Sequence, residues 1–474
     1  MGAIGDFLGT TTGIASLLVL IIAVLLVIIH YVSRDVDTTN WPTGTLDDDH
    51  HQRDRSPLPK PPDHGEDDTV LMEKGAAPSR KEIDDAFETQ SRSSRSAREA
   101  EPEAAATDVA VGEEVGEHYE VTVYYATDRR DLGGDQYVSK RFTDERALAA
   151  RRQSPITYGT CKVSIPKHHV VGELEAPSAF NPFDRNNADK YVILLSIDKK
   201  EKGEFFNALR ERIGRDSEKQ TFVFVHGFGV TFENAARRTA QMAYDLRFSG
   251  APIFYGWPTE SFGFLNPDFT AYSESENNAR WTTWHFKEFL LDVVQRTGAE
   301  TVHIIAHSMG NRIVADALLH LRHVMTAQEQ GVLREIILTA PDIDADVFVH
   351  QIAPEIAQLS SRVTLYASRN DQALKVSKTI HGYRRIGDFH DVTLFPEGVD
   401  TIDASEVETD SIGHNYYGAN ESVISDICQI LNGGAMADKR LSTLVSRTAT
   451  SGAKYWRVKK GVKLGDVWDD LWGA

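Results

Sequence analysis

The stretch that decides the fold is Val302-His303-Ile304-Ile305-Ala306-His307-Ser308-Met309-Gly310-Asn311. Strand-forming residues run up to Ala306, and a small-His-Ser-Met-Gly sequence then leads into an apolar helical pattern. This is the layout of a nucleophile elbow, in which a serine occupies a strained turn between a strand and a helix. Ala306 replaces the first glycine of the G-x-S-x-G pattern, but alanine is small enough for the tight turn. We therefore predict that Ser308 is the nucleophile of a serine hydrolase.

Buried strands and helices alternate on both sides of this stretch. Short apolar runs occur at 222–225, 252–255, 302–305, 336–338 and 363–366. Unbroken apolar runs are typical of a parallel sheet that is buried on both faces. Helical patterns separate these runs at 232–248, 274–296 and 312–324. The alternation predicts an α/β-hydrolase fold with a mostly parallel central sheet flanked by helices, and a site at the carboxyl ends of the strands.

A serine hydroxyl is a weak nucleophile, so the chain must also supply a base and an acid. Imidazole has a suitable pKa for the base, and a carboxylate is needed to hold its tautomer. His414 lies in a turn-like segment, and Asp371 follows the apolar run 363–366. The order Ser308, Asp371, His414 is that of α/β-hydrolases. Asp342 follows the preceding run, 336–338, and is the alternative acid; otherwise it would cap a turn or helix.

The tetrahedral intermediate of ester cleavage requires N–H donors that point at its oxyanion. The residue after the nucleophile normally supplies one donor, here the amide of Met309. The loop after the run 222–225 should supply the other, and we expect Phe228 in that role with Gly229 as the alternative. His226 is expected to shape this loop, and Trp257 to line a wall of the substrate pocket.

Composition narrows the possible partners and cofactors. The 474 residues carry a net charge of −19, which argues against a nucleic-acid partner. The two cysteines, Cys161 and Cys428, are far apart in sequence and form no disulfide or metal motif. The Asp342-x-Asp344-x-Asp346 spacing lacks the glycine and glutamate of a calcium loop. We therefore expect neither a metal nor a cofactor, while the oligomeric state stays open.

The first 117 residues differ from the rest in composition. After a short tail at 1–12, residues 13–32 are apolar and uncharged, long enough to span a bilayer as a helix. No basic n-region precedes this span, so a cleaved signal peptide is the weaker interpretation. Residues 33–117 are acidic and proline-rich, which predicts a disordered linker. Arg34, Arg53 and Arg55 follow the span, but this charge difference is too small to decide the membrane side.

The remaining boundaries place a hydrolase domain at 118–432 and a polar tail at 433–474. The tail ends in a short amphipathic stretch, 467–472, with tryptophans on one face. We expect either docking of this stretch onto the domain or a contact with a partner or bilayer interface. The segment 260–269 contains three phenylalanines and is either a lid over an acyl site or a packed loop.

The chain resembles the bacterial α/β-hydrolase family of uncharacterised esterase- and lipase-like proteins known as the domain of unknown function 900 group. The matching sequences are Val123-Tyr124-Tyr125-Ala126-Thr127-Asp128-Arg129, Val225-His226-Gly227-Phe228, Trp257-Pro258, Ala306-His307-Ser308-Met309-Gly310-Asn311-Arg312, Ala340-Pro341-Asp342-Ile343-Asp344 and Gly413-His414-Asn415-Tyr416-Tyr417. The resemblance covers roughly 118–431 and implies esterase-type chemistry on a small-molecule or lipid ester, without naming the substrate.

Together these observations predict a single-pass membrane esterase, with the bacterial inner membrane as its expected location. Two other functions use the same features. A catalytically inactive hydrolase fold would act as a membrane-bound scaffold, which the long linker would suit. An acyltransferase would use the same three residues and pass the acyl group to an acceptor other than water.

Overall fold

The structure is a computed structural model that describes residues 111–133, 138–147, 154–176, 187–260, 268–390, 395–407 and 413–472. The predicted membrane helix at 13–32 and most of the predicted linker lie outside these ranges. Among the helices that are described, none is long and apolar enough to cross a membrane.

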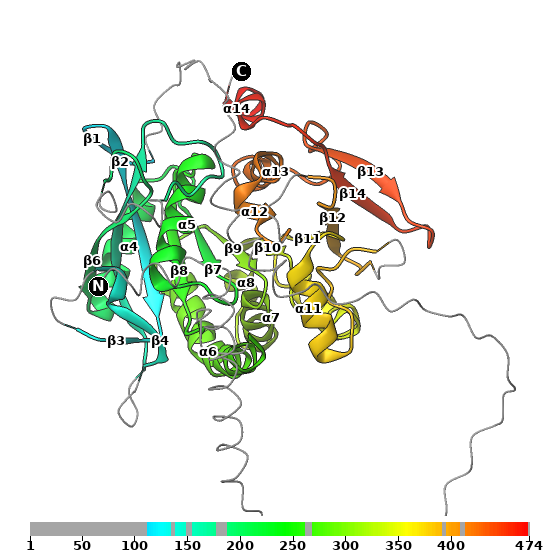
Figure 1. Cartoon of the computed structure of the whole chain (residues 1–474), viewed down its shortest axis with the longest axis horizontal. Helices are drawn as coiled ribbons and strands as arrows, with labels where there is room; N and C mark the ends of the chain where they lie inside the picture. The colour runs from blue at the N-terminus through cyan, green and yellow to red at the C-terminus, as the bar shows by residue number, and fades with distance from the viewer. Residues whose placement is uncertain are drawn as a thin grey trace, which may run out of the picture. The chain divides into compact units, whose positions relative to one another are not determined.

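Most of the described strands belong to one twelve-stranded sheet with the order β13-β14-β12-β11-β10-β9-β7-β8-β2-β5-β6, and β1 pairs with β2 (Figure 1). The strands are β1 (Glu113–Val115), β2 (His118–Thr127), β5 (Thr157–Pro166), β6 (Leu194–Lys200), β7 (Gln220–Val225), β8 (Ala251–Gly256), β9 (Thr301–His307), β10 (Leu333–Thr339), β11 (Arg362–Ala367), β12 (Val399–Asp403), β13 (Leu444–Thr448) and β14 (Lys454–Val458). A separate small sheet pairs β3 (Arg129–Asp131) with β4 (Phe142–Arg146).

The centre of the sheet is parallel and its edges are antiparallel. Neighbouring strands from β2 through β8, β7, β9, β10 and β11 to β12 all pair in parallel. Antiparallel pairs join β2 to β5, β5 to β6 and β13 to β14. The predicted mostly parallel sheet flanked by helices is therefore confirmed.

Helices connect the strands and cover both faces of the sheet. They are α4 (Lys202–Gly214), α5 (Phe232–Asp245), α6 (Asp268–Arg296), α7 (Gly310–Leu321), α8 (Ala327–Gln330), α9 (Ala345–Val347), η4 (Phe348–Ile352), α10 (Ala353–Ile356), α11 (Gln372–His381), α12 (Tyr416–Ala419), α13 (Glu421–Leu431) and α14 (Leu464–Trp472), with a short turn η2 (Val138–Lys140). One face packs against α4, α6 and α7, and the opposite face packs against α5, α12 and α13.

Strand β7 shows why the apolar runs are unbroken. Val223 and Val225 join the core shared with α6 and α7, whereas Phe222 and Phe224 join the core shared with α5 and α13. Successive side chains of a strand point to opposite faces, so a strand with helices on both sides must be apolar at every position. The same arrangement places the carboxyl ends of β9, β10 and β11 side by side at one edge.

The segment after 432 completes the sheet. In the structure β13 and β14 form a hairpin, and β14 pairs in parallel with β12 at Ile402–Trp456 and Asp403–Arg457, making the orange-red edge in Figure 1. The sequence prediction of a polar tail contained no strands here. The reason is that an edge hairpin is half exposed, so its short alternating pattern resembles a loop.

The end of the chain docks onto the domain, the first of the two alternatives for the amphipathic stretch. Leu464 and Val467 of α14 are buried in the core that includes α13. The guanidinium of Arg247 lies 3.5 Å from the ring centroid of Trp468, a cation–π contact. Trp472 keeps 41% of its surface exposed.

Other predicted helices differ from the structure mainly at their ends. Helix α5 ends at Asp245, before the predicted 248, because Arg247 has a φ of 47° that a helix cannot continue through. Helix α6 starts at Asp268, before the predicted 274, so the lid-or-loop segment 260–269 overlaps it. Residues 261–267 of that segment lie outside the described ranges.

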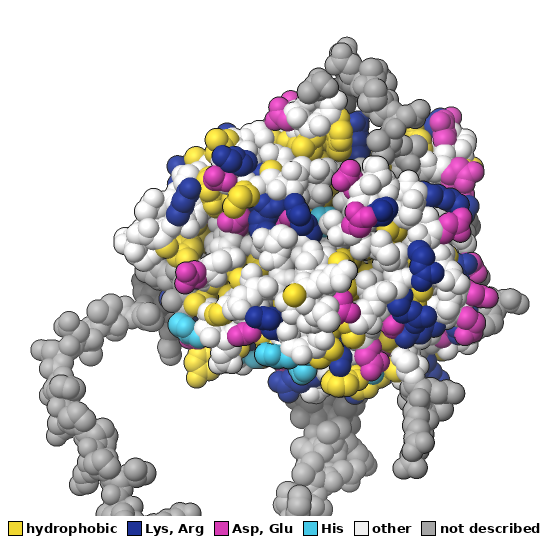
Figure 2. All heavy atoms as spheres, turned by 180° about the vertical axis from the view of Figure 1, so that it is seen from behind, with side chains coloured by type: hydrophobic (Ala, Val, Ile, Leu, Met, Phe, Trp, Pro, Cys, Tyr) yellow, Lys and Arg dark blue, Asp and Glu magenta, His cyan; other side chains and the backbone are white. Residues whose placement is uncertain are grey.

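The surface carries charges of both signs. On the face drawn in Figure 2, lysine and arginine side chains are interspersed with aspartate and glutamate. This face therefore shows no broad field of one sign that would steer a charged polymer.

Candidate active site

Ser308 occupies a strained turn at the carboxyl end of β9. Its φ is 51°, a left-handed conformation that is rare outside glycine. The Ser308 amide donates to the carbonyl of Thr339 at 3.0 Å, and the side-chain amide of Asn311 donates to the carbonyls of Ser308 and Thr339 at 3.0 Å each. Ser308 is 6% exposed. These bonds hold the backbone in the strained turn that a nucleophile elbow requires.

Two glycines allow the elbow to pack against the loop after β7. A Cβ at Gly310 would clash with the carbonyl oxygens of Val225 and His226. A Cβ at Gly227 would lie 2.9 Å from both the Ser308 Cβ and the His307 Nδ1. Only glycine fits at these positions, so the loop 226–229 packs directly against Ser308.

The structure joins His414 to Asp371. The His414 Nδ1 and the Asp371 Oδ2 are hydrogen-bonded at 2.7 Å. Asp371 is fully buried and caps α11, where its Oδ1 accepts the amide of Leu374 at 3.0 Å. Burial raises the pKa of Asp371, and the charge and hydrogen bond of His414 offset only part of this rise. A carboxylate fixed in this way accepts the His414 Nδ1–H and selects the tautomer whose Nε2 carries no hydrogen and could act as a base.

His307 ties His414 to the elbow. The His307 Nε2 and the His414 carbonyl are 3.1 Å apart, and the two ring centroids are separated by 4.5 Å. On its other side, His307 stacks on Tyr417 with centroids 4.4 Å apart. Burial holds the pKa of His307 far below its ordinary value, so the ring is neutral and its Nε2–H donates. His307 thus links His414 to the residue that directly precedes Ser308.

Asp342, the alternative acid, has other partners. Its Oδ1 accepts from Ser377 at 2.5 Å and lies 3.2 Å from the Arg385 Nε. Its Oδ2 accepts from the Tyr272 hydroxyl and lies 3.2 Å from the Arg312 Nη2. Burial alone would raise the pKa of Asp342, but the two arginines outweigh it and hold the pKa below the ordinary value. Asp342 is an ionised structural carboxylate whose described partners do not include His414.

The hydrogen bonds of the backbone amides distinguish the candidate oxyanion donors. The Gly229 amide donates to the Thr259 hydroxyl at 3.0 Å, so this alternative donor is already engaged. The Phe228 side chain packs over Tyr272 with ring centroids 5.4 Å apart, which fixes the backbone of the loop. Met309 is the cap residue of α7, where the first amides have no partner within the helix. Phe228 and Met309 stay the predicted donors, and the bond to Thr259 makes Gly229 the poorer candidate.

His226 and Trp257 support the loop from below. Both are buried, their rings stack at 5.4 Å, and the Trp257 indole donates to the His226 carbonyl at 2.7 Å. Burial lowers the pKa of His226 to about 3, so it is neutral at physiological pH. Trp257 was predicted to line a wall of the substrate pocket, but its indole is fully buried. Because the indole bonds to the His226 carbonyl, we assign Trp257 to positioning the loop instead.

Sequence reasoning overlooked a support of the oxyanion loop. The fully buried Arg129 donates to the Val230 carbonyl at 2.6 Å and to the Asp144 carboxylate at 2.7 Å. This arginine belongs to the Val123–Arg129 motif, and its only sequence signal was the family resemblance. Asn311 was overlooked in the same way, although it directly follows the elbow.

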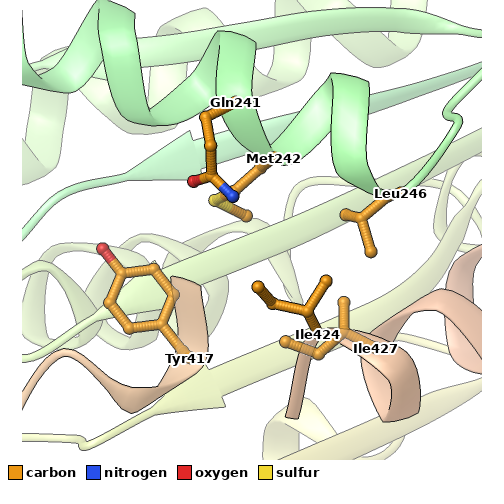
Figure 3. A pocket seen from close by; sticks show the side chains of 6 residues that line it. All are labelled: Gln241, Met242, Leu246, Tyr417, Ile424 and Ile427. Atoms are coloured by element: carbon orange, nitrogen blue, oxygen red, sulfur yellow. The ribbon is translucent and has the colours of Figure 1, made fainter. Parts of the chain in front are cut away.

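Two hollows were found away from Ser308. The first is a closed gap between α5 and the helices α12 and α13, too narrow to hold water (Figure 3). Its lining residues are Gln241, Met242, Leu246, Tyr417, Ile424 and Ile427. Tyr417 lines this gap and also stacks on His307, and a gap too narrow for water admits no substrate. The second hollow, of about 390 Å³, lies between α9, the last turn of α11 and the loop that follows it. Within the described residues, no cluster of three or more His, Cys, Asp or Glu could hold a metal.

Comparisons with solved structures give distant similarities. No curated protein matches the chain. Among solved structures, the carboxylesterase CesB (YbfK) from Bacillus subtilis is 13% identical with a TM-score of 0.26, covering 46% of this chain and 85% of that one. A lipase-esterase related protein from Clostridium acetobutylicum is 11% identical with a TM-score of 0.24, covering 45% and 93%. Esterase B from Lactobacillus rhamnosis is 11% identical with a TM-score of 0.24, covering 61% and 85%.

Such low identities and TM-scores carry no argument about activity, so the assignment depends on the family model. That model describes an alpha/beta hydrolase of unknown function, and it matches residues 201–433. The match contains Ser308, Asp371 and His414 together with the loop 226–229. Over these residues, the chain belongs to the DUF900 family of alpha/beta hydrolases of unknown function.

Proposed function

We propose that this chain is a serine hydrolase that cleaves carboxylic esters through an acyl-enzyme on Ser308. The observation that carries the proposal is the hydrogen bond of 2.7 Å between His414 and Asp371, in a chain whose Ser308 has a φ of 51° and whose His307, next to Ser308, contacts the His414 carbonyl. A strained serine, a base beside it and a buried carboxylate behind the base are the set that acyl transfer to serine needs.

The proposed reaction has two halves. In the first, the Ser308 Oγ attacks the ester carbonyl while His414 Nε2 takes the hydroxyl proton, and the amides of Phe228 and Met309 stabilise the oxyanion. The intermediate collapses, the C–O bond to the alcohol breaks, and His414 returns its proton to the leaving alcohol. In the second, His414 removes a proton from water, whose oxygen attacks the acyl carbonyl. The bond between the acyl carbon and the Ser308 Oγ then breaks, His414 returns its proton to Oγ, and the acid leaves.

A fluorophosphonate probe tests the nucleophile directly. The full-length protein should be labelled, and Ser308→Ala should not be labelled. Ser446→Ala is the matched control, since this serine is exposed on β13 far along the chain, and it should label like the wild type. Equal labelling of wild type and Ser308→Ala would show that Ser308 is not the nucleophile.

We further propose that residues 13–32 anchor the enzyme in a membrane. The support is the length of the uncharged apolar run in the sequence. The full chain should stay with the membrane fraction after alkaline extraction. Replacing Leu20 and Leu25 with lysine should release it, because each charge at the bilayer centre costs about 3 kcal/mol. The same two replacements at Thr38 and Thr39 are the control, and release by both pairs would contradict an anchor at 13–32.

A further inference from the structure

Helix α6 contacts the oxyanion loop, residues 226–229, at two neighbouring positions. The Phe228 ring packs against the Tyr272 ring with centroids 5.4 Å apart. At the next residue, the Gly229 amide donates to the Thr259 hydroxyl at 3.0 Å, and that hydroxyl donates to the Ser275 hydroxyl at 3.1 Å. Tyr272 and Ser275 are three positions apart on α6, so both contacts come from the same side of the helix.

The hydrogen bonds of this chain run from the loop toward α6. A hydroxyl carries one hydrogen and two acceptor positions. Because the Thr259 oxygen accepts the Gly229 amide, its own hydrogen is donated to Ser275. The Ser275 oxygen also accepts the Glu260 amide at 3.1 Å. Thr259 and Ser275 are both fully buried, so water cannot replace a hydroxyl that is removed from this chain.

The loop that donates to Thr259 packs against the nucleophile two residues earlier. A Cβ at Gly227 would lie 2.9 Å from the Ser308 Cβ, which leaves no space between loop and elbow. Gly229 has a φ of 72°, in the left-handed region that favours glycine. Phe228, a predicted oxyanion donor, lies between these two glycines. Fixing Gly229 on one side and Gly227 on the other therefore fixes the backbone of Phe228.

Two other side chains that support this region hold carbonyl groups at its ends. The Trp257 indole donates to the His226 carbonyl, and Arg129 donates to the Val230 carbonyl. The Thr259 hydroxyl instead holds the amide of the residue that directly follows Phe228. Its bond therefore acts at the part of the loop that must present N–H groups to the reaction.

We propose that Thr259 and Ser275 are positioning residues that set the oxyanion loop for acyl transfer at Ser308. This inference rests on the proposed function, because an oxyanion forms only if Ser308 attacks a carbonyl. Thr259 binds the Gly229 amide, and the Phe228 amide is thereby held toward the oxyanion. Ser275 acts through Thr259 by accepting its hydrogen and so fixing the orientation of the hydroxyl.

A trifluoromethyl ketone tests the oxyanion loop separately from the amount of folded enzyme. With hexyl trifluoromethyl ketone, the Ser308 Oγ adds to the carbonyl carbon, its proton passes to His414, and the ketone oxygen becomes the oxyanion. Thr259→Val keeps the side-chain shape but removes the hydroxyl. The Ki of the ketone should rise and kcat for p-nitrophenyl butyrate should fall, each roughly tenfold, with little change in KM, which corresponds to the loss of one hydrogen bond.

Two control variants separate positioning from a general loss of stability. Thr259→Ser keeps the hydroxyl, and its Ki should stay close to that of the wild type. Thr221→Val is the matched control, because Thr221 is a fully buried threonine at the other end of β7 whose hydroxyl donates to the Ala251 carbonyl at 2.6 Å. Titration with the fluorophosphonate probe counts the active sites, so partial unfolding lowers the titre without changing Ki. If Thr259→Val raises Ki no more than Thr221→Val does, the positioning role is overturned.

Ser275→Ala tests whether the two hydroxyls act as one chain. The Ki should rise by less than in Thr259→Val, because Thr259 can still accept the Gly229 amide. The double variant should have the Ki of Thr259→Val alone, because the two residues act along the same chain. A double variant in which the two effects multiply would overturn the shared chain. If Thr259→Val does not fold, an unchanged Ki in Ser275→Ala overturns the proposal.

Failure of this inference is distinct from failure of the proposed function. If Ser308→Ala is labelled by the fluorophosphonate like the wild type, the proposed function fails whatever Thr259 does. If Ser308 is the labelled residue and Thr259→Val has a wild-type Ki, only the positioning role fails. A Ki that falls in Thr259→Val would show that the released Gly229 amide binds the oxyanion, which would overturn the positioning role and replace Phe228 by Gly229 as the donor.

Discussion

Asp371 and Asp342 are both buried aspartates that follow neighbouring strands, β11 and β10, at the same edge of the sheet. Their partners differ. Asp371 bonds an imidazole at 2.7 Å, whereas Asp342 lies between two guanidinium groups and two hydroxyls. Under the proposed function, Asp371 orients a group that must change its proton during the reaction, whereas Asp342 is a permanent charge in a hydrogen-bonded network. Residue type and burial do not separate these roles; the neighbours do.

The largest expected difference between the two is in turnover. Asp371→Asn keeps the side-chain shape and the cap of α11 but cannot hold the reactive tautomer of His414, so kcat should fall on the order of 10⁴-fold. Asp342→Asn should leave kcat much closer to wild type. Steady-state kinetics on the full-length protein with its best ester would decide, and a larger kcat loss in Asp342→Asn would exchange the two assignments.

For stability, we expect the larger loss in the Asp342→Asn variant. Asp342→Asn leaves Arg312 and Arg385 without their buried carboxylate, and the free energy of unfolding should fall by about 3 to 5 kcal/mol. Asp344→Asn is the control, because Asp344 caps α9 and asparagine caps as well as aspartate. Urea denaturation measures both, and an Asp342→Asn variant as stable as Asp344→Asn would contradict the structural role.

A smaller effect should follow from the link between His307 and His414. His307→Phe keeps a ring against Tyr417 but loses the bond to the His414 carbonyl, so kcat should drop roughly tenfold. His303→Phe, at another buried histidine of β9, is the matched control and should not lower kcat. If His307→Phe retains full kcat, Asp371 alone is sufficient to position His414.

The two aspartates should contribute to the pH dependence of stability with opposite signs. The folded pKa of Asp342 lies below its ordinary value of 3.8, so its stabilising effect is present above pH 3.8 and is lost as the pH falls. The folded pKa of Asp371 lies above 3.8, so its charged form costs stability as the pH rises beyond that value. Relative to wild type, Asp342→Asn should recover in acid, whereas Asp371→Asn should gain stability above pH 3.8. The free energy of unfolding of each variant would be measured from pH 3 to 7. If both variants differ from wild type by an amount that changes with pH in the same way, the expected difference between the two aspartates is absent.

Local patterns in the sequence predicted the parts of the fold that depend on neighbours along the chain. The unbroken apolar runs indicated strands buried on both faces, and the strand–Ser308–helix pattern indicated the strained turn, now observed with φ at 51°. The hairpin of β13 and β14 was not predicted, because an edge strand buries only part of its surface and its pattern is short. Helix ends moved by several residues where a single backbone angle, as at Arg247, stopped the helix.

The sequence by itself predicted the reaction class, since a serine on an elbow, a later aspartate and a histidine follow one another in hydrolase order. The tertiary structure decided which aspartate contacts His414, that the Gly229 amide is bonded to Thr259, and that Trp257 is buried beneath the loop. The physical reason is distance: Asp371 and His414 are 43 positions apart in the chain and 2.7 Å apart in space. Periodicity encodes which face of an element is buried, but a hydrogen bond between distant loops exists only after the sheet has aligned the strands that hold them.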